Sequence, residues 1–128
     1  MSALAVPEPC PCGRGDTYPG CCGALHDGQR DAATAEELMR SRYAAYVVGD
    51  TSYLLRTWHP RTRPAELDAS RSPRWLDLTV LGTADGRWDD RFGEVEFRAT
   101  HSGGVLHERS RFIRRAGRWV YVDGDLLG

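Results

Sequence analysis

Four cysteines near the start of the chain constrain its fold more than any other feature. They form the pattern C-x-C-x8-C-C, with Cys10 and Cys12 before a glycine-rich segment and Cys21 and Cys22 after it. Zinc binds four thiolates tetrahedrally at about 2.3 Å, and two close pairs joined by a tight turn can supply them from one loop. We therefore predict that these four cysteines bind one structural Zn²⁺.

Other uses of the cysteines are weaker alternatives. Disulfides require an oxidising compartment, and Met1 to Pro9 lack the cationic and apolar regions of a signal peptide. A catalytic redox pair is typically C-x-x-C beside a βαβ unit, and the sequence has neither. His26, four residues after Cys22, could replace one sulfur, although a surface histidine is the more frequent case. A closed four-ligand site leaves no position for a reacting water, so the predicted role is structural.

The charge balance narrows the classes of partner. The chain of 128 residues has 17 basic residues, all arginine, against 18 acidic ones. Such a balance gives the protein no overall positive electrostatic field that would attract nucleic acid or acidic membranes. No apolar run approaches the roughly 18–20 residues that a membrane crossing needs. These features predict a cytoplasmic protein that binds neither membranes nor, as its general role, nucleic acid.

The distribution of cysteines and the apolar periodicity along the sequence predict two segments, residues 1–30 and residues 31–128. The first holds all the cysteines and little apolar periodicity, so it needs a metal to order it. In the second, Thr34 and Glu37 form a capping-box signature at the start of a helix that runs through Tyr46. The spacing predicts that this helix presents a core stripe, formed by Ala35, Met39, Tyr43 and Tyr46.

Short helices are expected next along the chain. Gly49 ends the first helix, and Asp50 or Thr51 can cap a second one that Pro60 terminates. A third helix is predicted from Pro64 to about Ala69, because proline is favoured in a first turn.

After Pro73 the periodicity changes to that of strands. We predict four strands, over residues 75–84, 87–101, 105–115 and 118–123, with turns at 85–86, 102–104 and 116–117. Helices followed by an antiparallel meander indicate an α+β fold.

The cysteine segment resembles a known zinc-binding module. The run Cys10-Pro11-Cys12-Gly13-Arg14-Gly15, followed by Tyr18 and Cys21-Cys22, resembles the SEC-C motif at the tail of the SecA preprotein translocase. That resemblance implies that the zinc ligands are Cys10, Cys12, Cys21 and Cys22. It also implies that this small zinc-binding segment, here called the zinc knuckle, could contact a protein partner.

Most of the remaining chain resembles the YchJ-like family of uncharacterised bacterial proteins. The resemblance rests on residues 39–47, 57–64, 108–112 and 117–124. It implies a SEC-C zinc-binding segment, residues 1–30, and a domain similar to nuclear transport factor 2, residues 31–128. Such an NTF2-like (cystatin-like) domain is a cone of helices packed on a curved antiparallel sheet. The fold often pairs through its sheet, so a homodimer is one expectation.

Two classes of function follow from these features. The first is an adaptor that presents its zinc knuckle to a protein partner; it is favoured because the metal site is the best-defined motif. The second is a small-molecule-binding protein, or an enzyme with Glu108 or His59 as general base, that uses the interior of the cone.

Alternation along the strands places the following candidates around that pocket: Trp58, His59, Glu108, Ser110, Trp119 and Tyr121. Phe112 would share the face of Glu108, and Asp123 that of Tyr121. In addition, Arg61 and Arg63 could form an anion-binding cluster with Arg40 or Arg42.

Overall fold

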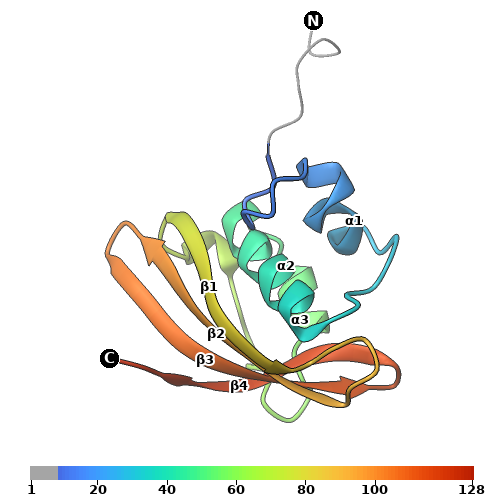
Figure 1. Cartoon of the computed structure of the whole chain (residues 1–128). Coiled ribbons are helices and arrows are strands. Elements are labelled where there is room, and N and C mark those ends of the chain that lie inside the picture. The colour runs from blue at the N-terminus through green and yellow to red at the C-terminus, as the bar shows by residue number, and fades with distance from the viewer. Residues whose placement is uncertain (1–8) are drawn as a thin grey trace, which may run out of the picture.

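A curved four-stranded sheet wraps around one long helix in the computed structural model, which describes residues 9–128 (Figure 1). The prediction about an export signal therefore lies almost entirely outside the described residues. The strands are β1 (Trp75–Asp85), β2 (Phe92–His101), β3 (Gly104–Arg115) and β4 (Arg118–Leu126), all antiparallel in the order β1-β2-β3-β4. The predicted mixture of helices and an antiparallel meander is confirmed.

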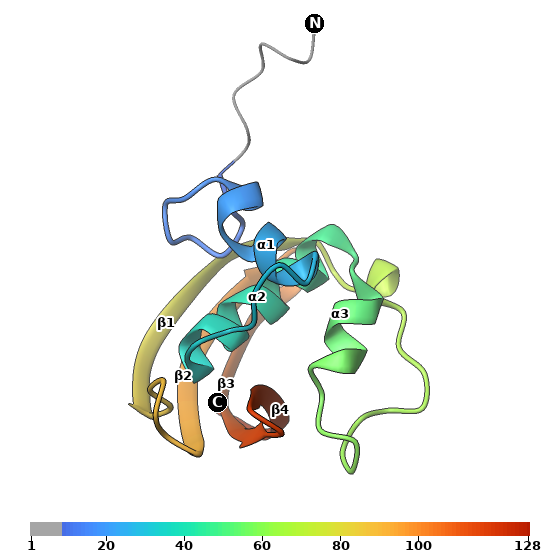
Figure 2. The same cartoon turned by 90° about the vertical axis from the view of Figure 1, so that its right-hand side faces the viewer.

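Helix α2 (Ala35–Val48) lies in the concave face of the sheet, and α3 (Thr51–Arg56) flanks the side that the sheet leaves open (Figure 2). The short helix α1 (Cys22–His26) packs on the other side of α2. None of the helices in residues 9–128 has the length and apolar character that a membrane crossing requires.

Local side-chain contacts explain where α2 and α3 begin. Thr34 Oγ1 accepts a hydrogen bond from the Glu37 amide at 3.0 Å, and the Glu37 carboxylate accepts one from the Ala33 amide at 2.8 Å. Gly49 ends α2 in the left-handed region, at φ 79°, and Asp50 caps α3 by accepting from the Tyr53 amide. These starts and stops confirm the sequence prediction.

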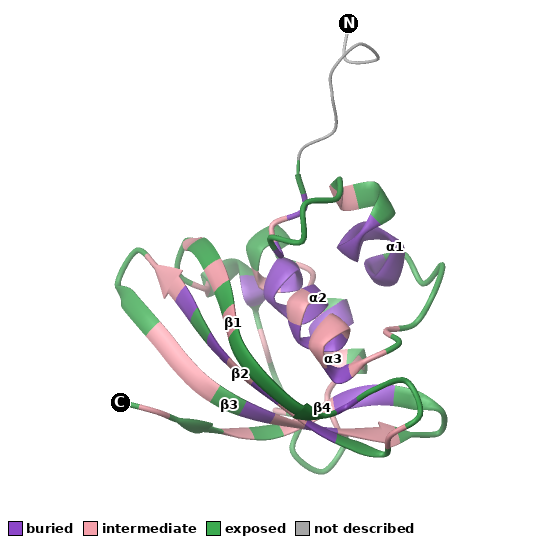
Figure 3. Ribbon diagram, in the orientation of Figure 1, coloured by how far each residue is buried: buried purple, intermediate pink, exposed green. Residues whose placement is uncertain are grey.

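Helix α2 is buried on two sides (Figure 3). Ala35, Met39 and Tyr43 pack into the main core with sheet residues such as Val95, as the predicted stripe requires. A second face of α2, which the predicted stripe did not include, packs against the cysteine segment through Ala44. The helix therefore separates the sheet from the cysteines.

Two predicted elements differ from the structure. Residues 64–68 form no helix; Asp68 instead caps a 3-10 turn, Ala69–Arg71, by accepting from the Ser70 amide. A helix of only six residues gains too few hydrogen bonds to form without packing. The predicted strand at residue 87 begins only at Phe92, because Asp90 accepts from the Arg87 amide and closes a turn before it.

Removing the α2 cap should have a modest, measurable cost. We expect Thr34→Ala to lower the free energy of unfolding by about 1 kcal/mol, because the Glu37 amide loses its acceptor. Urea titration measures this loss. Thr34→Ser keeps the hydroxyl and should stay close to the wild type, so an equal loss in both variants would contradict the capping explanation.

Candidate metal centre and cavity

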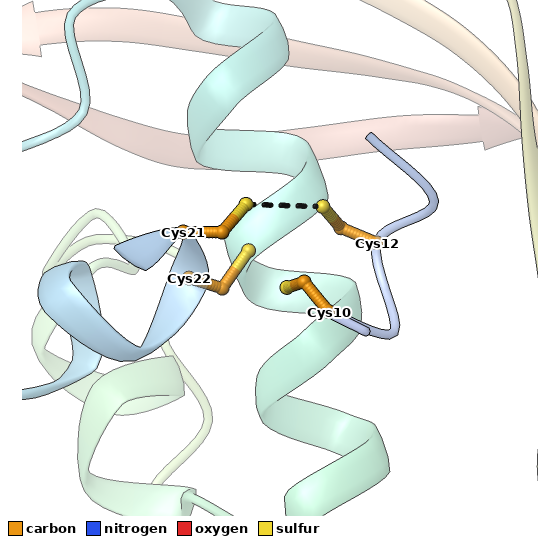
Figure 4. A group of neighbouring side chains, drawn as sticks. All are labelled: Cys10, Cys12, Cys21 and Cys22. Atoms are coloured by element: carbon orange, nitrogen blue, oxygen red, sulfur yellow. Dashed lines mark hydrogen bonds between the residues drawn. The ribbon is translucent and has the colours of Figure 1, made fainter. Parts of the chain in front are cut away.

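The four cysteine sulfurs converge in one place. Cys10 and Cys12 lie in a loop, while Cys21 and Cys22 lie at the start of α1, with α2 behind them (Figure 4). Their Sγ atoms all lie within 4.8 Å of one another, and those of Cys12 and Cys21 are 3.5 Å apart. Tetrahedral zinc with sulfur ligands requires sulfur separations of about 3.8 Å. Small shifts of the sulfur atoms would therefore accommodate an ion.

The electrostatics of the cluster suit a cation. All four thiols are buried and free. A hydrogen bond with the Cys22 thiol lowers the pKa of Cys12 to about 5, and the Arg14 amide donates to the same sulfur. Burial raises the pKa of Cys21 to about 12, and interaction with Cys12 raises the pKa of Cys22. Because further thiolates repel one another here, the cluster can deprotonate fully only with a cation such as Zn²⁺ among the sulfurs.

Backbone geometry and one distant arginine shape the ligand loop. Gly13 and Gly15 have φ values of 82° and 97°, which ordinary residues rarely adopt, and they turn the chain between the cysteine pairs. Arg40, on α2, donates from Nη1 to the Cys12 carbonyl at 2.7 Å. The Arg14 guanidinium, from the loop itself, pairs with Glu37 on α2 at 3.1 Å. No local sequence signal linked Arg40 to the loop.

His26 is neither a surface residue nor part of the group of converging cysteine side chains. It is 8% exposed, and its Nδ1 lies 2.6 Å from the Tyr18 hydroxyl. Its Nε2 lies 2.8 Å from the Ser41 carbonyl. Both ring nitrogens are thus engaged in fixing α1 and the preceding turn against α2. The prediction of a surface histidine is wrong, because α1 turns this side chain toward α2.

A cavity of about 320 Å³ lies between α2, the sheet and Trp58, which follows α3 in the chain. Its wall is largely aromatic and apolar, with three polar side chains among its residues. The wall residues are Met39, Arg42, Tyr43, Tyr46, Trp58, Trp75, Phe97, Ala99, Leu106, Glu108, Ser110, Phe112 and Tyr121. Ligand sites typically have volumes of about 300–1,000 Å³. This cavity lies near the lower end of that range and therefore suits a small molecule.

Four of the six predicted pocket residues line this cavity: Trp58, Glu108, Ser110 and Tyr121. The other two do not. The Nδ1 atom of His59 accepts from the Arg61 amide in an exposed turn, because the following proline directs the chain outward. Trp119 is in the core, where its Nε1 donates to the Ala33 carbonyl at 3.1 Å.

A bulge in β4 explains why Asp123 does not share a face with Tyr121. Tyr121 pairs with Phe112 and Asp123 pairs with Arg111, so Val122 is an extra residue without an opposite partner. After the bulge, Asp123 accepts from Arg111 on the outer face at 2.6 Å. Gly124 then faces inward, where an added Cβ would lie 2.3 Å from Glu108 Oε2. The glycine leaves room for the Glu108 carboxylate.

Arg42 is the polar cavity residue that the pocket prediction missed. Its side chain is buried, and its Nη1 donates to the Leu54 carbonyl and to Thr57 Oγ1, both at 2.8 Å. The predicted arginine cluster is not formed, because Arg40 bonds the cysteine loop on the other side of α2 and Arg63 bonds the Leu55 carbonyl. The helical spacing of Met39, Arg42, Tyr43 and Tyr46 is the signal that could have placed Arg42 on the cavity side.

Comparisons with known proteins agree with this architecture. The family model "YchJ, middle NTF2-like domain" matches residues 34–124. A UPF0225 protein of Streptomyces coelicolor is 60% identical over 119 residues, which cover 93% of this chain and 96% of that protein. A UPF0225 protein of Deinococcus radiodurans is 50% identical over 121 residues, which cover 91% and 88%.

Two solved structures are similar along most of their length. The solution structure of a SEC-C motif containing protein from Rhodopseudomonas palustris has a TM-score of 0.78 and 38% identity, and the match covers 93% of this chain and 98% of that one. The crystal structure of a SEC-C motif containing protein from Psychrobacter arcticus has a TM-score of 0.73 and 27% identity, with coverage of 93% and 82%. The matched domain, the curated relatives and the cysteine cluster together show that this chain belongs to the YchJ-like, UPF0225 family of uncharacterised bacterial proteins.

Proposed function

We propose that this chain is a zinc-stabilised, small-molecule-binding protein of the bacterial cytoplasm. The four thiolates hold a structural Zn²⁺, and the curved sheet and its helices form an NTF2-like cone whose interior holds the ligand. The observation that carries the ligand-binding role is the aromatic cavity of about 320 Å³, with the buried Arg42 guanidinium and the Glu108 carboxylate in its wall. Four free, clustered thiols support a reducing location.

Zinc is the metal that best suits this donor set. Four buried sulfurs form the cluster, and among residues 9–128 no oxygen or nitrogen donor joins them, which matches structural zinc sites. Protein purified under reducing conditions without chelator should contain one zinc per chain by elemental analysis. Iron in that analysis would replace the zinc assignment with an iron–sulfur one, and a metal-free, folded segment would contradict a metal site altogether.

Ligand binding can be tested by thermal stabilisation. A molecule that binds only the folded state raises the melting temperature in proportion to its concentration over Kd. We expect members of a small-metabolite panel to stabilise the wild type but not Leu106→Trp, which fills the cavity from a half-buried position. Stabilisation of both proteins would place the ligand outside the cavity, and no stabilisation by any member would count against this role.

An adaptor role for the zinc knuckle is a second candidate, supported by the exposure of residues 13–17 between the cysteine pairs. Asp16→Arg and Thr17→Arg change exposed side chains and should retain zinc. If the knuckle is a docking surface, both variants should lose capture of its protein partner. Unchanged capture would contradict the adaptor role while leaving the cavity proposal intact.

Catalysis, if the bound molecule reacts, falls to Glu108 rather than to His59. Among the described residues that line the cavity, Glu108 is the one carboxylate. Its Oε2 accepts from Ser110 Oγ at 2.6 Å and from the Tyr121 hydroxyl at 3.1 Å, which fixes the carboxylate in the wall. These contacts support a general-base role for Glu108 in this proposal.

A further inference from the structure

The Arg42 guanidinium is a buried cation that lacks a carboxylate partner within the described part of the chain. It is 6% exposed, and none of the ion pairs there includes it. Burial lowers its pKa to about 10, which still leaves it charged at neutral pH. The guanidinium carbon lies 4.8 Å from the Trp58 ring centre and 4.7 Å from that of Tyr121. A buried cation is costly without an anion, so this end of the cavity favours one.

Glu108 supplies the opposite charge in the same cavity; it attracts the Arg42 guanidinium over a distance but forms no ion pair with it. Its two hydrogen-bond donors, Ser110 and Tyr121, are both uncharged hydroxyls. No ion pair of the described residues includes Glu108 either. Tyr121 contacts both groups, through its ring with Arg42 and through its hydroxyl with Glu108. The cavity therefore presents a positive and a negative group on either side of one tyrosine.

Two further donors in the wall lack acceptors. The Nε1 atoms of Trp58 and Trp75 are buried and have no hydrogen-bond partner among the described residues. Buried indole N–H groups normally find an acceptor. Trp58 lies beside Arg42, so these two residues can donate to the same anionic group. The rest of the wall is apolar or aromatic and suits a hydrocarbon side chain.

We propose that the cavity binds a small zwitterion with an apolar or aromatic side chain, of the size and chemistry of an apolar α-amino acid. Its carboxylate accepts from Arg42 and the Trp58 indole, its ammonium donates to Glu108, and its side chain lies against Phe97 and Leu106. This inference rests on the proposed small-molecule role. A simple carboxylate would leave Glu108 unpaired and close to a like charge, and a simple amine would leave Arg42 and Trp58 without an acceptor.

Matched ligands test the two charges separately. L-phenylalanine, 3-phenylpropionate and 2-phenylethylamine share one apolar body and differ only in the charged groups that they carry. Leucine, methionine, tyrosine and tryptophan, each with its deaminated and decarboxylated analogue, extend the series to other side chains. Isothermal titration with the zinc-loaded full chain should show at least one amino acid binding about tenfold or more tighter than both of its analogues.

Two variants test which residues contact the charged groups of the ligand, and a third serves as a control. Glu108→Gln keeps an acceptor for Ser110 and Tyr121 but removes the charge, so the preference for the amino acid over its deaminated analogue should disappear. Trp58→Phe breaks no side-chain hydrogen bond that the described residues make, and it should weaken binding of both carboxylate ligands. Glu66→Gln changes an exposed glutamate in a loop and should leave binding unchanged. Far-ultraviolet circular dichroism checks that each variant is folded.

The outcomes separate the ligand class from the proposed function. If every amino acid that binds has a deaminated or decarboxylated analogue that binds as tightly, the zwitterion proposal is overturned. If other metabolites bind the wild type but not Leu106→Trp, and no amino acid does, the ligand class is wrong while small-molecule binding stands. If no molecule of either set binds, both proposals fall.

Discussion

Cys12→Ser should abolish stoichiometric zinc binding and unfold the segment from the cysteine loop through α1. Cys12 is fully buried, and the other three sulfurs gather around it. Zinc-finger peptides gain an apparent free energy of about 10–16 kcal/mol from their metal, comparable to the whole stability of an ordinary domain, about 5–15 kcal/mol. Leu25 of the segment also packs against α2 and α3, but a buried leucine contributes only about 1.5–3 kcal/mol. These contacts do not replace the contribution of the metal.

Unfolding of the cysteine segment should also destabilise the rest of the domain, because both pack against α2. Ala44 is completely buried against the cysteine segment, and the Arg40 guanidinium bonds the Cys12 carbonyl. Unfolding of the segment exposes this face of α2 and removes that contact, so the melting temperature of the sheet domain should also fall. Circular dichroism reports the melting temperature, and hydrogen exchange reports the local loss of amide protection.

Chelation of the wild type and Thr17→Ser are the controls for this experiment. Chelator should reproduce the Cys12→Ser result without a substitution. Thr17→Ser removes only a methyl group from an exposed residue of the same loop and should retain zinc. Amide protection in residues 21–27 that stays at its wild-type level after the metal is removed would contradict a metal-dependent fold.

Phe112→Ala should lower the free energy of unfolding by about 3–5 kcal/mol. Phe112 is 2% exposed in the main core, and its ring packs edge-on against Tyr121 at 5.8 Å between ring centres. Because the ring also borders the cavity, its removal enlarges an existing space that the neighbouring side chains cannot easily fill. In thermal unfolding this loss corresponds to a decrease of roughly 10–20 °C.

A variant on the same strand controls for effects of strand propensity. Val105 also lies on β3 but is 60% exposed, so Val105→Ala should cost well under about 1 kcal/mol. Urea titration of both variants gives the comparison. Similar losses in the two would show that burial of Phe112 does not determine the stability of this strand.

Features that depend on neighbours in sequence could be predicted well. The cap at Thr34, the stop at Gly49 and the alternation of Val95, Phe97 and Ala99 each follow from residues a few positions apart, and the structure confirms them. The convergence of the four cysteines belongs to the same class, because all of them lie within residues 10–22.

Features that depend on distant contacts could not be predicted in this way. Alternation assigned Asp123 to the face of Tyr121, but the extra residue Val122 reverses the faces beyond it. A bulge of this kind depends on the partner strand, and the sequence of β4 alone does not indicate it. The contact of Ala44 with the cysteine segment likewise required α2 to be buried on two sides, whereas an amphipathic pattern is usually interpreted with one.

The two-sided burial of α2 has a consequence for how this family can vary. Residues on one side of the helix must fit the cysteine segment, and residues on the other must fit the sheet, so substitutions on the two sides can accumulate independently. The axial position of the helix, however, is common to both. An insertion or deletion of a single residue within it would rotate every later side chain by about 100°. The residues that pack against the cysteines and those that line the cavity would then be misaligned together. We therefore expect the length of this helix to vary less among relatives than the loops at either end.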